Sequence, residues 1–468
     1  MNKHTFKNKY IDLIKQTFDF PQEGFNVVDN ELHFYDVPLM KIIEQYGTPL
    51  KISYLPKIGQ QIQKAKKLFN VAMAKADYKG TYTYCYCTKS SHFSFVLEEV
   101  LKNDAHIETS SAFDIPIVKD LFKSGHLKQD KYIVCNGYKT DIYKKYITDL
   151  INDGFSNVIP VVDNKEEIEY YKSYAKNKLK IGIRIASEEE PSFEFYTSRL
   201  GLRYKDIKDC YLQQIHDHPK LELKMLHFFI NKGIKDSIFY WSELAKCLRV
   251  YVELKKICPT LDTLNIGGGL PIRTSMNFSF DYEYIIEEIV SQIKAYCQQN
   301  DVQEPNIFTE FGSFTVGESG ASLYNVLDQK QQNDTELWNM IDSSFITSLP
   351  DVWGINQRFI LMAINNWEKE YQRVNLGGLT CDGLDYYNAE AHINQVFLPK
   401  YEKENPLYIG FFHTAAYQES LSGYGGIKHC LVPAPKHVLI DRDENGEYTT
   451  WLFAKEQSYK SMLKILGY

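Results

Sequence analysis

Eight short apolar runs alternate with amphipathic stretches between residues 81 and 310 of this chain of 468 residues. Strands that alternate with helices form a parallel sheet with right-handed crossovers. Eight such units predict an α/β fold of the (β/α)8 TIM-like barrel type, and an open doubly wound sheet is the alternative. The predicted strands lie at Thr81–Cys87, Ala105–Thr109, Lys131–Cys135, Asn157–Val162, Lys180–Ala186, Leu223–Ile230, Leu261–Ile266 and Asn306–Glu310.

The stretches between the strands carry helix signals. Ser110 and Ser111 precede apolar residues at helical spacing and Gly125 follows them, which predicts an N-cap serine and a C-terminal glycine. A longer helix is expected from about residue 236 to 257. Apolar residues from Ile58 to Met73 predict a helix that leads into the first strand.

The pattern changes on both sides of the barrel. Residues 26–50 read as strand, turn and helix, and short β-like runs with Gly and Pro between them follow residue 311. We therefore expect an N-terminal segment (1–50) that joins a β-rich domain, a barrel (51–310) and a β-rich C-terminal domain (311–468). A helix around Gln457–Leu466 should close the chain.

Composition narrows the class of protein. The net charge of −7 argues against a nucleic-acid surface. The chain has no uncharged apolar stretch of about 18 residues, and Met1–Lys7 lacks the apolar core of a signal peptide, so neither a membrane nor secretion is expected. The nine cysteines are dispersed, which indicates reduced thiols in a cytoplasm. His and Cys do not occur at metal-ligand spacing, so we expect no metal site.

Polar residues recur where the predicted strands end. In this kind of barrel the chemistry lies at the C-terminal ends of the strands. Lys89 follows the first strand and is a candidate Schiff-base nucleophile, whereas a lone lysine there would be a surface residue. The other strand-end residues are Glu108, Asn136, Asp163, Arg184, His227, Phe229 and Glu310.

Two of these strand ends suggest a charged ligand. Gly267, Gly268 and Gly269 directly follow the seventh strand, where glycines let the backbone N–H groups approach an anion. A flexible turn is the simpler interpretation of three glycines. Glu310 ends an apolar strand and needs a cationic partner, which a protonated pyridine nitrogen or Arg184 would provide.

Together these residues resemble the alanine racemase-type (fold III) decarboxylases dependent on pyridoxal 5'-phosphate (PLP), which act on ornithine, arginine, lysine and diaminopimelate. The resemblance covers residues from about 26 to 450. It implies that Lys89 carries PLP, that the three glycines bind its phosphate, and that Glu310 meets its pyridine nitrogen. Glu108, Arg184 and Phe229 would complete the cofactor site.

The resemblance extends to the C-terminal third. It implies that Cys381 reprotonates the substrate carbanion, that Asp382 meets the substrate, and that Tyr417 contacts the phosphate. In the family these elements reach the active site of the partner subunit, so an obligate homodimer with shared sites is implied, with a higher oligomer as a further option.

Within the family, the segments at residues 348–353 and 416–419 are most similar to the biosynthetic arginine decarboxylases. The implied reaction turns L-arginine into agmatine and CO2, a step toward polyamines such as spermidine. Asp382, Asp351 and Glu419 are the candidates to receive the cationic end of the substrate, because a planar guanidinium favours a carboxylate.

Three departures from the family pattern involve four positions. Phe229 stands where the family has the histidine that stacks on the cofactor ring, and Asn231-Lys232 replaces Gly-Ser. Ser313 replaces an arginine, which removes one phosphate ligand. We hypothesise that Lys232 supplies part of the missing charge.

Other functions stay open on the sequence. The substrate could be another diamino acid: ornithine, lysine, diaminopimelate or carboxynorspermidine. A PLP racemase would need a tyrosine base, and the Cys-Asp motif argues against it. A binding homologue without catalysis is disfavoured because Lys89, Glu310 and Cys381 occur together.

Overall fold

The structure, a computed structural model, describes residues 8–190, 194–387 and 396–468 and contains two compact units. Unit 1 takes in residues up to 57, 272–279 and 316–468. Unit 2 comprises residues 58–271 and 280–315. The expectation about a leader falls on residues 1–7, outside the described part. Among the described residues, no helix has the length and apolar character needed to cross a membrane.

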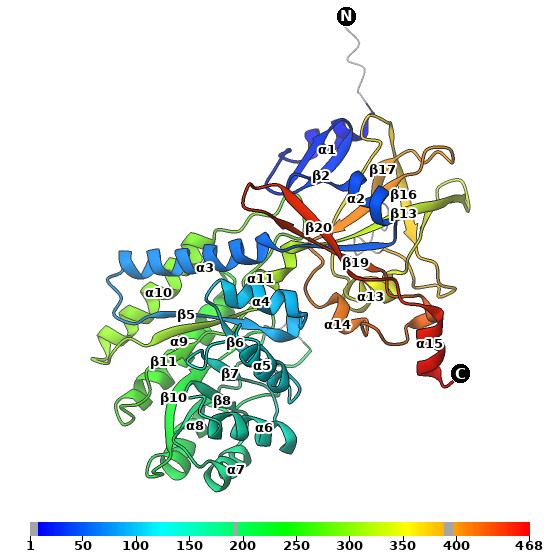
Figure 1. The fold of residues 1–468 in the computed structure, drawn as a ribbon. Coiled ribbons are helices and arrows are strands. Elements are labelled where there is room, and N and C mark those ends of the chain that lie inside the picture. Colours follow the sequence, from blue (N-terminus) through cyan, green and yellow to red (C-terminus); the bar gives the residue numbers. More distant parts are fainter. Residues whose placement is uncertain (1–7, 191–193, 388–395) are drawn as a thin grey trace, which may run out of the picture. The chain divides into compact units, whose positions relative to one another are not determined.

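Unit 2 is a closed parallel barrel, so the open-sheet alternative is excluded (Figure 1). Its strands follow one another in chain order around the barrel, and the last strand, β12, pairs with the first, β5, to close it. The eight predicted strands are confirmed. They are β5 (Tyr82–Cys87), β6 (His106–Thr109), β7 (Ile133–Cys135), β8 (Val158–Val162), β9 (Leu179–Arg184), β10 (Leu221–His227), β11 (Thr263–Asn265) and β12 (Asn306–Phe311).

Side chains from several strands fill the inside of the barrel. Val134, Ile159, Met225 and Phe308 belong to one fully buried cluster. Because parallel strands are buried on both faces, they read as continuous apolar runs, and this is why the sequence located them. The helices are α3 (Pro56–Lys75), α4 (Ser94–Lys102), α5 (Asp114–Lys123), α6 (Asp141–Asn152), α7 (Lys165–Tyr174), α8 (Tyr204–Cys210), α9 (Ile238–Lys255) and α10 (Tyr282–Gln299).

The start of α5 differs from the sequence prediction. The predicted N-cap serine is wrong, because the helix begins at Asp114 and its N-cap position, Phe113, makes no side-chain cap. Instead the Asp114 carboxylate accepts the backbone N–H groups of Ser110 (2.7 Å) and Ser111 (3.0 Å). The predicted C-terminal glycine is confirmed, since Gly125 has a φ of +80° just past the last turn.

Unit 1 is β-rich, as predicted. One sheet has the order β17-β16-β14-β13-β4-β19-β20, with β18 and β15 attached beside β13. Its strands are β4 (Leu50–Tyr54), β13 (Gly320–Gln331), β14 (Leu337–Ile341), β15 (Ile360–Ala363), β16 (Tyr371–Gly377), β17 (Val396–Pro399), β18 (Tyr408–Phe412), β19 (Lys436–Arg442) and β20 (Tyr448–Ala454). β4 comes from the N-terminal part of the chain, so the segment before the barrel completes this sheet.

The rest of unit 1 packs on that sheet. The strands β1 (Phe25–Val28), β2 (Glu31–Phe34) and β3 (Val37–Pro38) form a small antiparallel sheet. Trp367 is fully buried between Tyr10 and Phe20 and donates its indole N–H to Ala363 O at 2.9 Å. The helices are α1 (Tyr10–Thr17), α2 (Leu39–Tyr46), α12 (Phe345–Ser348), α13 (Pro350–Ile355), α14 (Gln418–Leu421) and α15 (Tyr459–Leu466).

Candidate active site

Lys89 lies in a short 3-10 turn (Thr88–Ser90) directly after β5. It is exposed, although Thr88 and Ser90 on either side are buried. Its Nζ lies 5.8 Å from the centre of the Phe229 ring, which follows β10 on the other side of the mouth. The structure therefore brings Lys89, the candidate nucleophile, and Phe229 to the same end of the barrel.

Glu310 is buried near the end of β12 and accepts hydrogen bonds from several groups. Asn265 Nδ2 donates to Oε1 at 2.7 Å, and His227 Nε2 lies 3.1 Å from Oε2. Asn136 Nδ2 donates to Oε2 at 3.4 Å. Arg184, the partner considered from the sequence, donates instead to Asn136 Oδ1 at 3.2 Å. The carboxylate is thus held by a histidine and two amides.

These contacts decide the charge at this end of the barrel. Burial alone would raise the pKa of Glu310, but His227, Lys89 and Asn265 outweigh it and hold the pKa below its ordinary value. Burial lowers the pKa of His227, although Glu310 partly opposes the shift. We assign a neutral His227 that donates from Nε2 and an anionic Glu310, because an N–H donor stabilises the carboxylate without a second buried charge.

The glycine segment lies against the backbone of Glu310. Gly267 and Gly269 have φ values of +69° and +91°, a region that favours glycine. A Cβ at Gly268 would lie 2.2 Å from Glu310 O, and one at Gly269 would lie 2.5 Å from Gly233 Cα. Asn265 joins this segment to the carboxylate, because its Oδ1 accepts the Gly267 N–H at 2.9 Å.

A second carboxylate, Glu108, is buried at the end of β6. Burial and the neighbouring Glu310 carboxylate raise its pKa to about 8, so it is protonated at neutral pH. Its Oε2 accepts the thiol of Cys87 at 2.7 Å. Glu108 and Glu310 therefore differ in charge at pH 7, Glu108 being neutral and Glu310 anionic.

This end of the barrel fits a bound PLP molecule. Among the described residues, five buried polar atoms here have no hydrogen-bond partner: Thr88 Oγ1, Ser90 Oγ, Glu108 Oε1, Arg184 Nε and His227 Nδ1. Buried polar atoms are rarely left without partners, so a polar ligand is expected. The glycine segment suits a phosphate group, and Glu310 suits a protonated ring nitrogen.

The Cys-Asp motif lies in unit 1, in the loop after β16. Cys381 is exposed and Asp382 is partly exposed. The loop is fixed by Asp385, which is buried and accepts the N–H of Phe345 (2.8 Å) and both the N–H (3.1 Å) and the hydroxyl (2.7 Å) of Thr380. The motif thus sits on a loop with a rigid base.

The other predicted substrate residues have partners inside unit 1. Asp351 at the start of α13 accepts Gln418 Nε2 at 2.7 Å, and burial raises its pKa. Glu419 forms a buried ion pair with Lys51. Tyr417 directly precedes Gln418 and Glu419 in the chain. It has a φ of +68°, a conformation that non-glycine residues seldom adopt.

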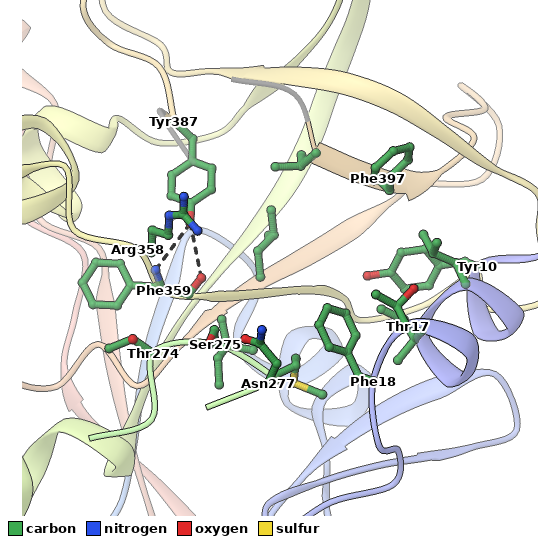
Figure 2. A pocket seen from close by; sticks show the side chains of 16 residues that line it. Tyr10, Thr17, Phe18, Thr274, Ser275, Asn277, Arg358, Phe359, Tyr387 and Phe397 are labelled. Atoms are coloured by element: carbon green, nitrogen blue, oxygen red, sulfur yellow. Dashed lines mark hydrogen bonds between the residues drawn. The ribbon is translucent and has the colours of Figure 1, made fainter. Parts of the chain in front are cut away.

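Unit 1 also contains a cavity of about 530 Å³. Figure 2 shows aromatic rings around it, among them Tyr10, Phe359 and Phe397. Tyr387 Oη donates to Phe359 O across one side at 3.2 Å. The lining includes none of the predicted site residues.

Sequence reasoning missed the groups that hold the site residues. Asn265, Cys87 and Asp385 were read only as parts of longer segments, yet each makes a direct hydrogen bond to a site residue or to the loop that carries one. Asn265 precedes the glycines by two residues and Cys87 precedes Lys89 by two. Cys87 is the last residue of β5 and pairs with Glu108 on β6, so its place at a strand end is the signal that could have found it.

A closed barrel with a lysine, a glycine segment and a buried carboxylate at one end defines a class of enzymes that carry a phosphorylated cofactor on the lysine. Comparison with known proteins agrees with this class. The profile of the pyridoxal binding domain of pyridoxal-dependent decarboxylases matches residues 57–317. The match covers more than half of the chain, and the chain belongs to this family.

Relatives are similar over nearly the whole chain, and solved structures share its fold. The biosynthetic arginine decarboxylase of Prochlorococcus marinus (strain MIT 9215) is 24% identical over 92% of this chain and 85% of the relative. The one from Marinobacter nauticus is 23% identical over 88% and 83%. The crystal structure of the Campylobacter jejuni biosynthetic arginine decarboxylase has a TM-score of 0.79 at 19% identity, over 98% and 90% of the two chains. Diaminopimelate decarboxylase from M. jannaschii gives 0.78 at 17%, over 94% and 96%.

The glycine segment provides a test of the cofactor site. Gly268→Ala should weaken PLP binding by at least about tenfold, or 1.4 kcal/mol, because the added Cβ must displace the Glu310 carbonyl. Equilibrium dialysis of the cofactor-free protein against PLP measures the effect. Gly354→Ala is the matched control, since nothing lies within 4 Å of a Cβ there. Equal affinities for the two variants would contradict this role of the glycine segment.

The raised pKa of Glu108 predicts a pH-dependent stability. The folded protein keeps this proton up to about pH 8, whereas the unfolded chain releases it near pH 4.5. Between these values the folded state binds more protons, so the free energy of unfolding falls as pH rises. Glu108→Gln removes this titration, and the variant should gain stability relative to the native chain up to about pH 8. Urea unfolding of the cofactor-free proteins across this range measures it, and a constant difference would refute the assignment.

Proposed function

We propose that this chain decarboxylates L-arginine to agmatine and CO2, with PLP as its cofactor. The observation that carries the proposal is Glu310, a buried carboxylate kept anionic beside a glycine segment that suits a phosphate. Support for arginine comes from the relatives named above, which match nearly the whole chain. The alternative substrates are ornithine, lysine, diaminopimelate and carboxynorspermidine.

PLP, when bound, supplies an electron sink for the electrons that the departing carboxyl group leaves behind. Lys89 would hold the cofactor through its amine, and Glu310 would keep a proton on the pyridine nitrogen. His227 and Asn265 would keep Glu310 anionic and fixed in place. The protein therefore contributes orientation and electrostatics at this end of the barrel.

Phe229 would pack against one face of the cofactor ring. An apolar ring can stack there, but unlike histidine it neither donates a hydrogen bond nor titrates. Glu108, protonated at neutral pH, and Arg184 would meet polar groups of the cofactor through the atoms that lack partners. Phe229 and Ser313 are the features that favour a homologue without catalysis, and a label on Lys89 with no released CO2 would show that alternative.

Cys381 would donate the proton that replaces CO2 on the α-carbon, and Asp382 would bind the guanidinium of the substrate. Asp351 and Glu419 are less suited to this task, because Gln418 and Lys51 already occupy them. We propose that these two carboxylates instead stabilise the segment that carries Tyr417, while Tyr417 contacts the phosphate.

We propose that the chain forms a homodimer in which unit 1 of one subunit completes the site of its partner. Support comes from exposed apolar side chains around the Cys-Asp motif and Tyr417, which a dimer interface would cover. They are Trp353, Ile355, Leu379, Leu384, Leu421, Tyr424 and Leu431. We place the enzyme in the cytoplasm, because its nine cysteines are free thiols.

Trapping of the cofactor tests the function most simply. The purified protein should show the visible absorbance of bound PLP, and borohydride reduction followed by peptide mass spectrometry should find the label on Lys89. Released CO2 and the amine product are then measured with arginine, ornithine, lysine and diaminopimelate. Agmatine from arginine supports the proposal. A label on Lys89 with another amine product would change the substrate, and an unlabelled protein would refute the whole function.

Lys232 tests the proposed replacement of a phosphate ligand. It is exposed beside Gly233, whose backbone packs on Gly269. Lys232→Ala should weaken PLP binding by about two- to fivefold, because an exposed charge contributes up to about 1 kcal/mol. Lys235→Ala removes the same charge from an exposed site three residues away and should leave the affinity unchanged. Similar affinities of the two variants would show that Lys232 is not a phosphate ligand.

A further inference from the structure

Two cysteines of unit 1 lie next to each other although they are 49 residues apart in the chain. The Sγ atoms of Cys381 and Cys430 are 3.9 Å apart, and both side chains are exposed. The other seven cysteines of the chain are buried. Within the subunit, Cys381 and Cys430 are therefore the two cysteines whose thiols are exposed, and in the proposed dimer a reagent would reach them through the substrate opening.

Neighbouring residues of the two segments also meet. His429 Nε2 lies 3.4 Å from Asp382 Oδ2. The two neighbouring pairs therefore run side by side, Cys381 next to Cys430 and Asp382 next to His429. Cys430 has a φ of 53° and a ψ of 22°, a strained left-handed conformation that non-glycine residues seldom adopt. Such strain is found where the surrounding structure holds a residue in place for a purpose.

We propose that Cys381 and Cys430 form a reversible disulfide that switches the enzyme off. The inhibition rests on the proposed role of Cys381 as proton donor, whereas formation of the bond rests on the geometry alone. A disulfide needs sulfurs about 2.05 Å apart, so they must approach by roughly 2 Å. Rotation of two exposed side chains can supply much of this movement, and Asp385 keeps the base of the loop fixed meanwhile.

The oxidant is a low-molecular-weight disulfide such as oxidised glutathione. The thiolate of one cysteine attacks a glutathione sulfur, forms a mixed disulfide and expels one glutathione thiolate. The second cysteine then attacks the protein sulfur and expels the other. Two protein thiols are oxidised, one glutathione disulfide is reduced to two thiols, and a thiol reductant reverses the sequence. Exposed disulfides of this kind are the labile ones.

The bond also removes the group that the reaction needs. A sulfur in a disulfide carries no proton, so it cannot act as an acid. Loss of a positioned acid lowers kcat by about 10²- to 10⁴-fold. Cofactor binding to unit 2 should not change, because the pair contains no residue of the barrel. The oxidised enzyme is therefore expected to keep its PLP absorbance and lose its activity.

The holoenzyme is tested in a glutathione buffer with the reduced form in excess. The number of thiols titrated in the folded protein should fall by two per chain. Mass spectrometry should find the Cys381 and Cys430 peptides joined, without attached glutathione. Activity should fall by about 10²-fold or more, and dithiothreitol should restore it. Free thiols under these conditions, or glutathione left on Cys381, would overturn the proposed bond.

Cys430→Ser is the matched variant. When reduced it should be as active as the native enzyme, because Cys430 takes no part in the reaction. In the same buffer it should keep most of its activity, since excess reduced glutathione removes a mixed disulfide from Cys381. Equal loss of activity in both proteins would contradict the switch. If the two peptides are joined and the enzyme keeps full activity, the role of Cys381 as proton donor is refuted. If the reduced native enzyme releases no CO2, the proposed function is refuted, and the disulfide is still judged by the joined peptides.

Discussion

The hydrogen bonds to Glu310 are the interaction on which the rest of the candidate site depends. A buried carboxylate is costly unless donors and charges surround it, and here Asn265, His227 and Asn136 provide the donors. They come from the ends of three strands, so the carboxylate is held only when the barrel is closed. The fold itself therefore maintains a fixed negative charge at one end of the barrel, where a pyridine nitrogen would need it.

The same contacts couple the two ends of the proposed cofactor site. Asn265 accepts the Gly267 N–H and donates to Glu310, so one side chain positions both the glycine segment and the carboxylate. Glu108 stays protonated beside an anionic Glu310 because two close carboxylates do not both ionise when they are buried. Phe229 and Ser313 would change how the ring and the phosphate are held and would leave this electrostatic arrangement in place.

Much of the fold could be predicted from the sequence, because parallel barrel strands are buried on both faces and read as apolar runs. The positions of Lys89, Glu310 and the three glycines at one end then follow from the order of the strands. The partners of these residues could not be predicted in the same way. Whether Arg184 or His227 contacts Glu310 depends on distances across the barrel. Whether Asp114 or a serine binds the free N–H groups at the start of α5 depends on the local turn. The contacts of Glu419 with Lys51 and of Cys381 with Cys430 join segments too distant in the chain for any pattern to link them.

The charge of Glu310 is the central claim, and the Glu310→Gln variant tests it most directly. Glutamine keeps the size and can keep one of the amide hydrogen bonds, but it removes the negative charge. The variant should still bind PLP and still be trapped on Lys89 by borohydride, because neither depends on this charge. Its kcat for decarboxylation should fall by about 10²- to 10³-fold, the usual effect of removing one preorganised electrostatic group. A variant that binds PLP and keeps the native kcat would contradict the account.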